Sequence, residues 1–449
     1  MTGTAATEIG GDTTAREFSL NKSKESADIE DLQAFQDTRL CIVDEISFAE
    51  YHRILQKLSS NLKAYTETPE CQYGKVGMVF LGDFCQLEPI GGDPIYLQEN
   101  GILWEQALTA MVELKGTHRY LNCPEMQRIM PGIRENGLSE LDRNILNSRV
   151  VDGNRLKMPP LSSTRFATFF NKTRAHINSA VFLQYLKKHH ANCDQSNVPR
   201  SAIVVKGHVK WAGCQATLTF EQRKVLFEDC CEADFMDSWK KRADPFLCLL
   251  SGCDLMGLLN DDVKNGIANG TLSKFRKIKF KPGKVSSPIQ VHDYWVHGVN
   301  IEDVEYLELE WSDSRFEGHF RVKPMNGKFN VKFPIVEFGE KMTVPTQVSL
   351  IHFPVVLNHA TTGHKLQGKS LDSLVIAEWS KQKNWAYVVL SRVRTLEGLF
   401  LLKPIPENID FDPKLEYLIM MDKLRNSILA LPEDVSGLRS EFKDLPTTT

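Results

Sequence analysis

Short apolar runs recur along the chain and alternate with amphipathic stretches. The runs are LCIVD (40–44), VGMVFLGD (76–83), RFATFF (165–170), SAIVV (201–205) and LDSLVIAEW (371–379). Runs of this length predict buried strands, and strands that alternate with helices predict parallel sheets covered by helices. Because 449 residues exceed what one core normally organises, we expect an α/β protein of two or three domains.

Two other segments have a different pattern of apolar and polar residues. PEMQRIMPGIRENGLSELDRNIL (124–146) predicts helices with a break at Pro131–Gly132. Between about residues 277 and 349, alternating stretches such as VEYLELEWSD and KFNVKFPIVEF are separated by glycine and proline. This alternation predicts a small antiparallel β module, resembling an SH3 barrel and inserted into the α/β fold.

The composition places the chain inside a cell without naming a partner. A net charge of −3 neither indicates nor excludes nucleic-acid binding. The ten cysteines form no Cys-x-x-Cys pair, which is typical of reduced thiols. No segment is apolar for long enough to span a bilayer, and the first residues lack a signal-peptide pattern. We expect an intracellular protein without membrane contact, for which the nucleus and the mitochondrion are both compatible compartments.

Carboxylates and an amide follow the first two runs. Asp44 ends the first run and Glu45 follows it, whereas Asp83 ends the second run and Gln86 follows three residues later. The carboxyl ends of parallel strands form the edge at which open α/β folds bind ligands. There, one carboxylate can hold Mg²⁺ through water, another can polarise the water that attacks a γ-phosphate, and the glutamine can bind that phosphate. Solvated acids and a satisfied turn amide remain the alternative.

Cationic residues follow later runs. Arg119 and Arg392 could neutralise charge on a transferring phosphoryl group, although single arginines are most often surface residues. The stretch HATTGHKLQGKSLD (359–372) brings together Thr362, His364 and Lys365. A hydroxyl, an imidazole and an ammonium group suit a sugar-phosphate backbone, which they can hold without reading bases. A plain basic loop is the alternative.

Taken in order, these stretches resemble the Pif-type helicases, the RecD-related branch of superfamily-one 5′-to-3′ DNA helicases. CIVDEIS resembles their motif II, LGDFCQLEPIGG motif III, ATTGHKLQGKSLD motif V and AYVVLSRVRTLEGL motif VI. The resemblance runs from the first residues to about residue 404. It implies two RecA-like lobes of the P-loop NTPase fold, the second carrying the SH3-like β module.

The start of the chain, MTGTAATEIGGDTTA, resembles motif Ia of the same family. In that family the phosphate-binding (Walker A) loop, Gly-x-x-Gly-x-Gly-Lys-Ser/Thr, precedes motif Ia. We therefore expect this loop upstream of Met1, so that the chain alone would be inactive. The implied division is residues 1–118, a first lobe without its opening strand and loop; 119–276, the first part of the second lobe; 277–349, the β module; 350–410, the second lobe with motifs V and VI; and 411–449, a C-terminal helix and tail.

The resemblance also assigns roles to residues. It implies a magnesium ligand, a catalytic base and a γ-phosphate sensor in the first lobe: Asp44, Glu45 and Gln86. It implies two arginines that close on the phosphates from the second lobe, with a glycine near the nucleotide: Arg119, Arg392 and Gly368. It implies DNA-binding positions in motifs Ia and V: Thr2, Gly3, Thr362, His364 and Lys365. Leu366 replaces the serine that motif V usually has.

The function implied is that of an ATP-dependent DNA helicase that uses ATP and Mg²⁺. Its partners would be single-stranded DNA and forked or structured duplex DNA, and its roles would lie in DNA repair, recombination or telomere maintenance. We expect a monomer. The alternatives are a catalytically inactive module that binds single-stranded nucleic acid, and a remnant of a transposon-encoded helicase.

Overall fold

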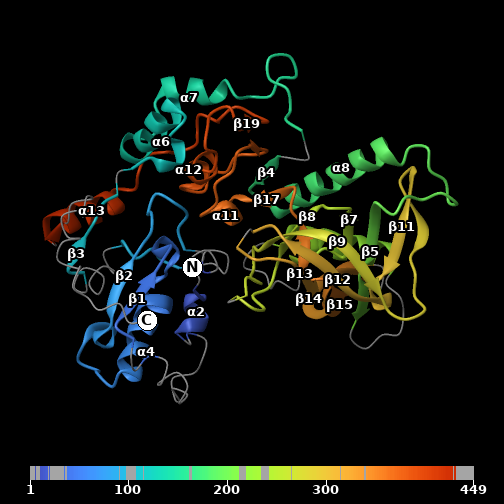
Figure 1. Cartoon of the computed structure of the whole chain (residues 1–449), viewed down its shortest axis with the longest axis horizontal. Helices are drawn as coiled ribbons and strands as arrows, with labels where there is room; N and C mark the ends of the chain where they lie inside the picture. The colour runs from blue at the N-terminus through green and yellow to red at the C-terminus, as the bar shows by residue number, and fades with distance from the viewer. Residues whose placement is uncertain are drawn as a thin grey trace.

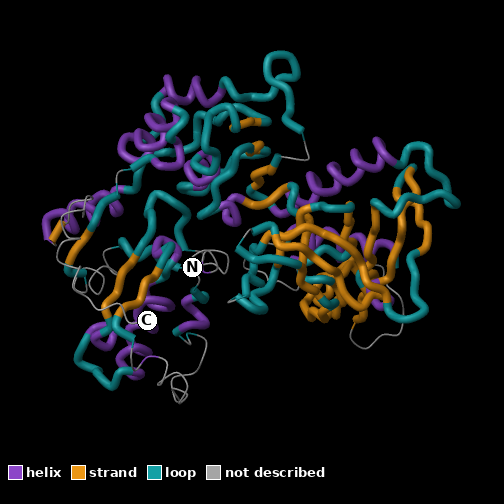
Figure 2. Tube along the Cα trace, in the orientation of Figure 1, coloured by secondary structure: helices purple, strands orange, loops and turns teal. Residues whose placement is uncertain are grey.

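The computed structural model describes most of the chain and has a mixed α/β fold (Figures 1 and 2). The described residues are 6, 11–18, 20, 35, 38–89, 92–97, 108–114, 116–160, 164–211, 219–233, 242–263, 265–313, 315–337, 340–427 and 429–430. Figure 1 shows a first lobe in blue, a second lobe in teal and red above it, and a β-rich region in yellow beside them. Among the described residues, no helix combines the length and the hydrophobicity that a bilayer crossing needs.

The first lobe is built on a parallel strand pair, as predicted. Strand β1 (Leu40–Val43) pairs with β2 (Gly77–Phe80), and the π-helical turn at Tyr51–Gln56 with helix α4 (Lys57–Tyr65) connects them. The pairing continues past the strands, since the Leu81 N–H donates to the Val43 carbonyl at 2.9 Å. One face of β1 stays uncovered, because Leu40 and Ile42 are 56% and 55% exposed.

The second lobe contains an all-parallel sheet of four strands. Its order is β17 (Ala360–Thr362), β4 (Arg165–Thr168), β18 (Leu374–Ile376) and β19 (Leu399–Leu401). Helices α8 (Asn171–His189), α11 (Gly363–Leu366) and α12 (Trp385–Leu390) accompany it. Trp385 is fully buried in a core that apolar residues of the sheet share with the preceding helices.

The predicted helix break at Pro131–Gly132 is wrong. Helix α6 (Pro124–Asn136) runs through both residues and ends before Gly137, whose φ of 75° lies in the region that glycine favours. Helix α7 (Glu140–Asn147) then begins after Ser139, whose hydroxyl accepts the Asp142 N–H at 3.1 Å. The stop and start signals therefore lie at residues 137–139, and the helix tolerates its internal proline.

The alternating stretches form antiparallel strand pairs, as predicted, but their three sheets also include strands from outside residues 277–349, and the third sheet is mixed. The first is β13 (His319–Val322), β12 (Val304–Trp311), β9 (Leu272–Phe280), β8 (Asp254–Gly257) and β16 (Val355–Leu357). The second is β14 (Met325–Glu337), β15 (Glu340–His352) and β6 (His208–Trp211). The third is β10 (Ser287–Val291), β11 (Tyr294–Asn300), β5 (Ala202–Lys206) and β7 (Phe246–Leu250).

Strand β5 corrects one prediction. It comes from the run SAIVV, which the sequence placed in a parallel α/β sheet, yet it pairs antiparallel with β7 and parallel with β11. An apolar run shows that a strand is buried but does not select its neighbours. Helix α9 (Phe220–Glu232) packs beside β14, and its Thr219 and Gln222 form a capping box.

The last described helix returns to the first lobe. Met420 and Leu424 of α13 (Leu415–Ser427) are buried in the same core as Val43 and Ile46. Strand β20 (Leu429–Ala430) pairs with β3 (Ala110–Met111), so α13 and β3 lie side by side in Figure 1. The described chain therefore crosses between the lobes twice, once after β3 and once before α13.

Candidate active site

Glu45 occupies an unusual backbone position at the end of β1. Its φ is 54° and its ψ is 45°, a left-handed conformation that is uncommon outside glycine and is found at functional sites. The Glu45 N–H donates to Asp44 Oδ1 at 2.8 Å. The side chain reaches the second lobe, where Gln367 Nε2 donates to Glu45 Oε2 at 3.3 Å. One carboxylate of the predicted pair thus meets the motif V stretch.

The electrostatics of Glu45 suit a proton acceptor. Burial raises the pKa of Glu45 and the neighbouring Asp44 raises it further, whereas Gln367 and Arg392 act in the opposite direction. Gly368 lies on the same side, since a Cβ built on it would come 3.5 Å from Glu45 Oε1. A carboxylate whose pKa is raised toward neutrality accepts a proton from water more readily.

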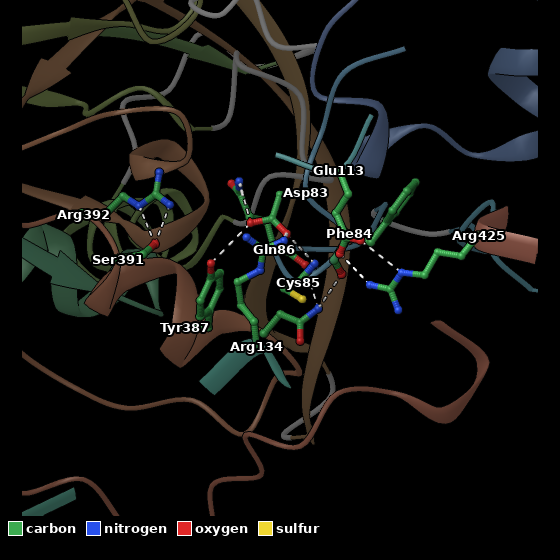
Figure 3. Close-up of polar contacts among 11 residues, drawn as sticks. Asp83, Phe84, Cys85, Gln86, Glu113, Arg134, Tyr387, Ser391, Arg392 and Arg425 are labelled. Carbon is green, nitrogen blue, oxygen red and sulfur yellow. Dashed lines mark hydrogen bonds and ion pairs between the residues drawn. The ribbon is translucent and has the colours of Figure 1, made fainter. Parts of the chain in front are cut away.

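The loop after β2 holds Gln86 next to Asp83. The Gln86 backbone N–H donates to the Asp83 carbonyl at 3.0 Å, and Gln86 Nε2 lies 3.5 Å from Asp83 Oδ2 (Figure 3). Gln86 Oε1 is buried and accepts no hydrogen bond from the described residues. An acceptor held in this way fits the orientation of a water molecule that attacks a phosphate.

Both predicted arginines lie in the second lobe and close together. Arg119 donates through Nε to Ser370 Oγ and through Nη1 to the Ser391 carbonyl, both at 2.9 Å. Arg392 is 1% exposed, and it donates to the Val388 carbonyl at 2.7 Å and to Ser391 Oγ at 2.5 Å. Burial, and after it the positive charge of Arg119, lower the pKa of Arg392 to about 10. Two neighbouring guanidinium groups favour a polyanion such as a nucleotide phosphate.

The described residues could hold Mg²⁺ only in a water-rich form. No group of three or more His, Cys, Asp or Glu side chains suited to a metal lies in the described part of the chain. Asp44 and Glu45 alone form the carboxylate pair at the end of β1. Mg²⁺ usually keeps several waters and binds through one or two carboxylates together with substrate phosphates, so the pair fits such an ion.

The predicted DNA-binding residues of motif V are more enclosed than expected. Thr362 precedes helix α11, and Lys365 Nζ donates to Asn269 Oδ1 at 2.7 Å. Burial lowers the pKa of Lys365 to about 7 and that of His364 to about 4. Leu366, in the place of the usual serine, is 2% exposed and packs in the second-lobe core.

Thr2 and Gly3 of the predicted DNA-binding set lie outside the described residues. The structure therefore brings together Glu45, Gly368, Arg119 and Arg392, and places Gln86 on the adjacent loop. It adds residues that sequence reasoning missed, namely Arg134, Gln367, Asn384 and Tyr387. Gln367 and Tyr387 lie inside the motif V and VI stretches and Asn384 lies two residues before the latter, and this proximity is the signal that could have found them.

One stretch fits the general pattern of a phosphate-binding loop but has another shape. GHKLQGKS (363–370) reads Gly-x₄-Gly-Lys-Ser. In such loops the Gly-Lys-Ser segment opens a helix that follows a strand. Here helix α11 comes before Gly368, and the chain after Ser370 leads to β18. Lys369 Nζ lies 3.4 Å from the Gly270 carbonyl. The stretch therefore does not form a phosphate cradle.

Known proteins resemble the chain in sequence and in fold, although no protein-family model matches it. It is 24% identical over 405 residues to the ATP-dependent DNA helicase Pif1 of Psychrobacter sp. (strain PRwf-1), covering 84% of this chain and 55% of that protein. It is 24% identical over 434 residues to the ATP-dependent DNA helicase Pif1 of Bdellovibrio bacteriovorus, covering 92% of this chain and 79% of that protein. The chain thus spans about half the length of the first relative, 55%.

A solved structure shares the fold. The crystal structure of Pif1 helicase from Bacteroides in complex with ADP-AlF3 and ssDNA superposes with a TM-score of 0.62 at 17% identity, covering 95% of this chain and 86% of that one. At this level of identity the likeness establishes the arrangement of two RecA-like lobes and an added β region.

Proposed function

The chain is a relative of the Pif1 helicases in sequence and fold, and from this relationship we propose that it is an ATP-dependent DNA helicase that moves 5′ to 3′ along single-stranded DNA. The observation that carries the proposal is the meeting of Glu45 with residues of the other lobe. Gln367 hydrogen-bonds its carboxylate, and Arg392 lies near enough to lower its pKa. An ATPase that closes two lobes around a phosphate chain needs a base on one side and cations on the other.

The described residues can divide the chemistry among them. Bound ATP with Mg²⁺ supplies the phosphoryl group that is transferred to water. Asp44 would hold the ion, and Glu45 would take a proton from the attacking water. Gln86 would orient that water through its Oε1. Arg119 and Arg392 would neutralise the charge that develops on the phosphate oxygens, which is the largest part of catalysis in this class of reaction.

The DNA track would run over the motif V stretch. We assign Thr362, His364 and Lys365 to the sugar-phosphate backbone, together with Thr2 and Gly3. Single-stranded DNA and forked or structured duplexes are the proposed partners, and the chain would act as a monomer in DNA repair, recombination or telomere maintenance. The nucleus and the mitochondrion are the proposed compartments.

Steady-state ATPase assays with and without single-stranded DNA test the proposal. Since the family's loop Gly-x-x-Gly-x-Gly-Lys-Ser/Thr does not occur in residues 1–449, they use both this chain and a form extended at its N-terminus by a strand and such a loop. We expect little turnover by the former and DNA-stimulated turnover by the latter. Glu45→Gln should lower turnover by about 10²–10⁴-fold while nucleotide binding survives. Full turnover by Glu45→Gln would remove Glu45 from the role of base.

Duplexes with a single-stranded tail test the direction of movement. A 5′ tail should support unwinding by the extended form and a 3′ tail should not; the reverse preference would refute the proposed polarity.

The salt dependence of DNA binding tests the role of Lys365. Lys365→Glu should weaken DNA binding and reduce the slope of log affinity against log salt by about 1. Lys187→Glu, at an exposed lysine near the end of α8, is the matched charge reversal and should leave the slope unchanged.

The alternative function is a module that binds single-stranded nucleic acid without turning over ATP. The basic side chains of Lys365, Arg242 and Lys369 support it, since they act on one another and require no nucleotide. DNA binding with salt-dependent affinity, combined with no turnover by the extended form, would favour this alternative.

A further inference from the structure

Asp83 collects polar contacts from both lobes (Figure 3). Within the first lobe, Asp83 Oδ1 accepts the Cys85 N–H at 3.0 Å, and Oδ2 lies 3.5 Å from Gln86 Nε2. From the second lobe, Arg134 of α6 places Nη2 3.5 Å from Asp83 Oδ1. Tyr387 of α12 donates its hydroxyl to Asp83 Oδ2 at 3.4 Å. A single carboxylate thus joins the loop of Gln86 to two helices of the other lobe.

These contacts are partly shielded from solvent. The side chains of Asp83 and Arg134 are 20% and 38% exposed. Burial acts to lower the pKa of Arg134, but Asp83 and the other groups around the guanidinium together raise that pKa above its usual value. Burial, and then Asp83, raise the pKa of the Tyr387 hydroxyl. At neutral pH, Arg134 is therefore a cation and the Tyr387 hydroxyl is a donor, as both contacts require.

Helix α12 connects the contact at Tyr387 to Arg392. Asn384 precedes α12 in a left-handed conformation, with a φ of 66°, and its Nδ2 donates to the Gln86 carbonyl at 2.7 Å. Helix α12 then carries Tyr387 and ends at Leu390. Arg392 Nε donates to the Val388 carbonyl of the same helix at 2.7 Å, so the guanidinium moves with the helix.

We propose that Asp83, Arg134 and Tyr387 form an interlobe latch that positions Arg392 relative to Gln86. Arg134 and Tyr387 are positioning residues, because their contacts reach Asp83 and not the nucleotide. A displacement of Gln86 changes its contact with Asp83, and α12 follows because Asp83 and the Gln86 backbone hold its first turn. The inference rests on the proposed ATPase function for its effect on turnover, whereas the latch itself is a property of the lobe arrangement.

The matched test compares two tyrosines that each donate to a carboxylate. Tyr387→Phe removes the contact between the lobes. Tyr96→Phe removes a hydroxyl that donates to Glu88, where both partners belong to the first lobe. Spin labels on non-natural amino acids at Glu70 and Glu140, which are both exposed and lie in different lobes, report the interlobe distance by pulsed EPR in the nucleotide-free 449-residue chain.

The latch predicts a broader distance distribution for Tyr387→Phe, and an unchanged one for Tyr96→Phe. In the extended form, DNA-stimulated kcat should fall about fivefold for Tyr387→Phe, equivalent to about 1 kcal/mol, while KM for ATP changes less than about twofold. Arg134→Gln should act in the same direction, and the double variant should lose no more than the larger single effect.

A Tyr387→Phe distance distribution that matches that of Tyr96→Phe would overturn the latch, even if Arg134→Gln fails to fold. An absence of turnover in every extended form would instead refute the proposed function. The distance measurement needs no nucleotide, so it would still decide whether the latch exists.

Discussion

Replacing Gly368 with alanine should destabilise the second lobe through the backbone alone. The Lys369 N–H donates to the Leu366 carbonyl at 3.0 Å across a turn in which Gln367 has φ −59° and ψ 141°, and Gly368 has φ 78°. These angles define a type II turn, whose third residue needs a positive φ. An added Cβ would meet nothing closer than Glu45 Oε1 at 3.5 Å, an ordinary contact. The cost is therefore conformational and should be about 1–2 kcal/mol.

A second glycine in the same lobe provides the control. Gly132 lies inside α6, and a Cβ added there meets nothing within 4 Å and no positive φ. Alanine at that position should stabilise the same lobe by about 0.5–1 kcal/mol. Gly368→Asn should recover part of the loss, since asparagine tolerates the left-handed region better than alanine does. Urea unfolding of the variants, extrapolated linearly to water, gives the free energies of unfolding.

Gly368→Ala and Gly132→Ala should change the free energy of unfolding in opposite directions. If Gly368→Ala stabilises the lobe as Gly132→Ala does, then the positive φ is not required and the turn is wrongly assigned. If Gly368→Asn costs as much as Gly368→Ala, a steric clash rather than the backbone angle sets the cost.

Three further outcomes are expected. Burial lowers the pKa of Lys365 in the folded protein to about 7, below its ordinary value of 10.5. Between these two pH values the unfolded chain binds more protons than the folded one, so the free energy of unfolding should rise as pH rises. Lys365→Met should flatten this rise, as measured by urea titrations at several pH values. Asn178→Ala should lower the free energy of unfolding by about 2–4 kcal/mol, as measured by thermal unfolding. The buried side-chain amide of Asn178 forms hydrogen bonds of 3.0 and 2.9 Å with backbone groups of β16 and β17, so an unchanged stability would contradict the prediction. Leu424→Ala, at a 4% exposed position against Val43, should cost about 2–5 kcal/mol and speed amide exchange in β1; unchanged exchange would mean that α13 does not stabilise the strand.

Local patterns predicted the strand ends well. The apolar run before Asp44 predicted a strand with an acidic end at the ligand edge, so the β1–β2 pair and the position of Glu45 followed from a few adjacent residues, although one face of β1 is exposed and not buried as predicted. The same holds for two strands of the parallel second-lobe sheet, β4 and β18, and for the antiparallel pairs of the alternating β region. In each case, residues adjacent in the sequence are enough to predict where the strand lies.

Contacts between distant residues could not be predicted in this way. The hydroxyl of Tyr387 and the carboxylate of Asp83 are 304 positions apart, and no local pattern specifies that they meet. The partners of β5 depend on which strands compete for its edges, and its own sequence does not encode them. The sequence predicted Lys365 as an exposed phosphate contact. In the structure its ammonium group donates to Asn269, 96 positions away, and Arg242 lowers its pKa, and no local pattern specifies either neighbour.

The return of α13 to the first lobe limits how the lobes can move. Covalent chain passes between them after β3 and again before α13, and the second passage is anchored by Leu424 in the first-lobe core and by the Arg425–Glu113 ion pair at 2.5 Å. A rigid body attached at two points can rotate only about the line that joins them, whereas one attached at a single point can also twist and tilt. Opening and closing would then follow one axis, so that each cycle returns the phosphate-facing surfaces of the two lobes to the same register.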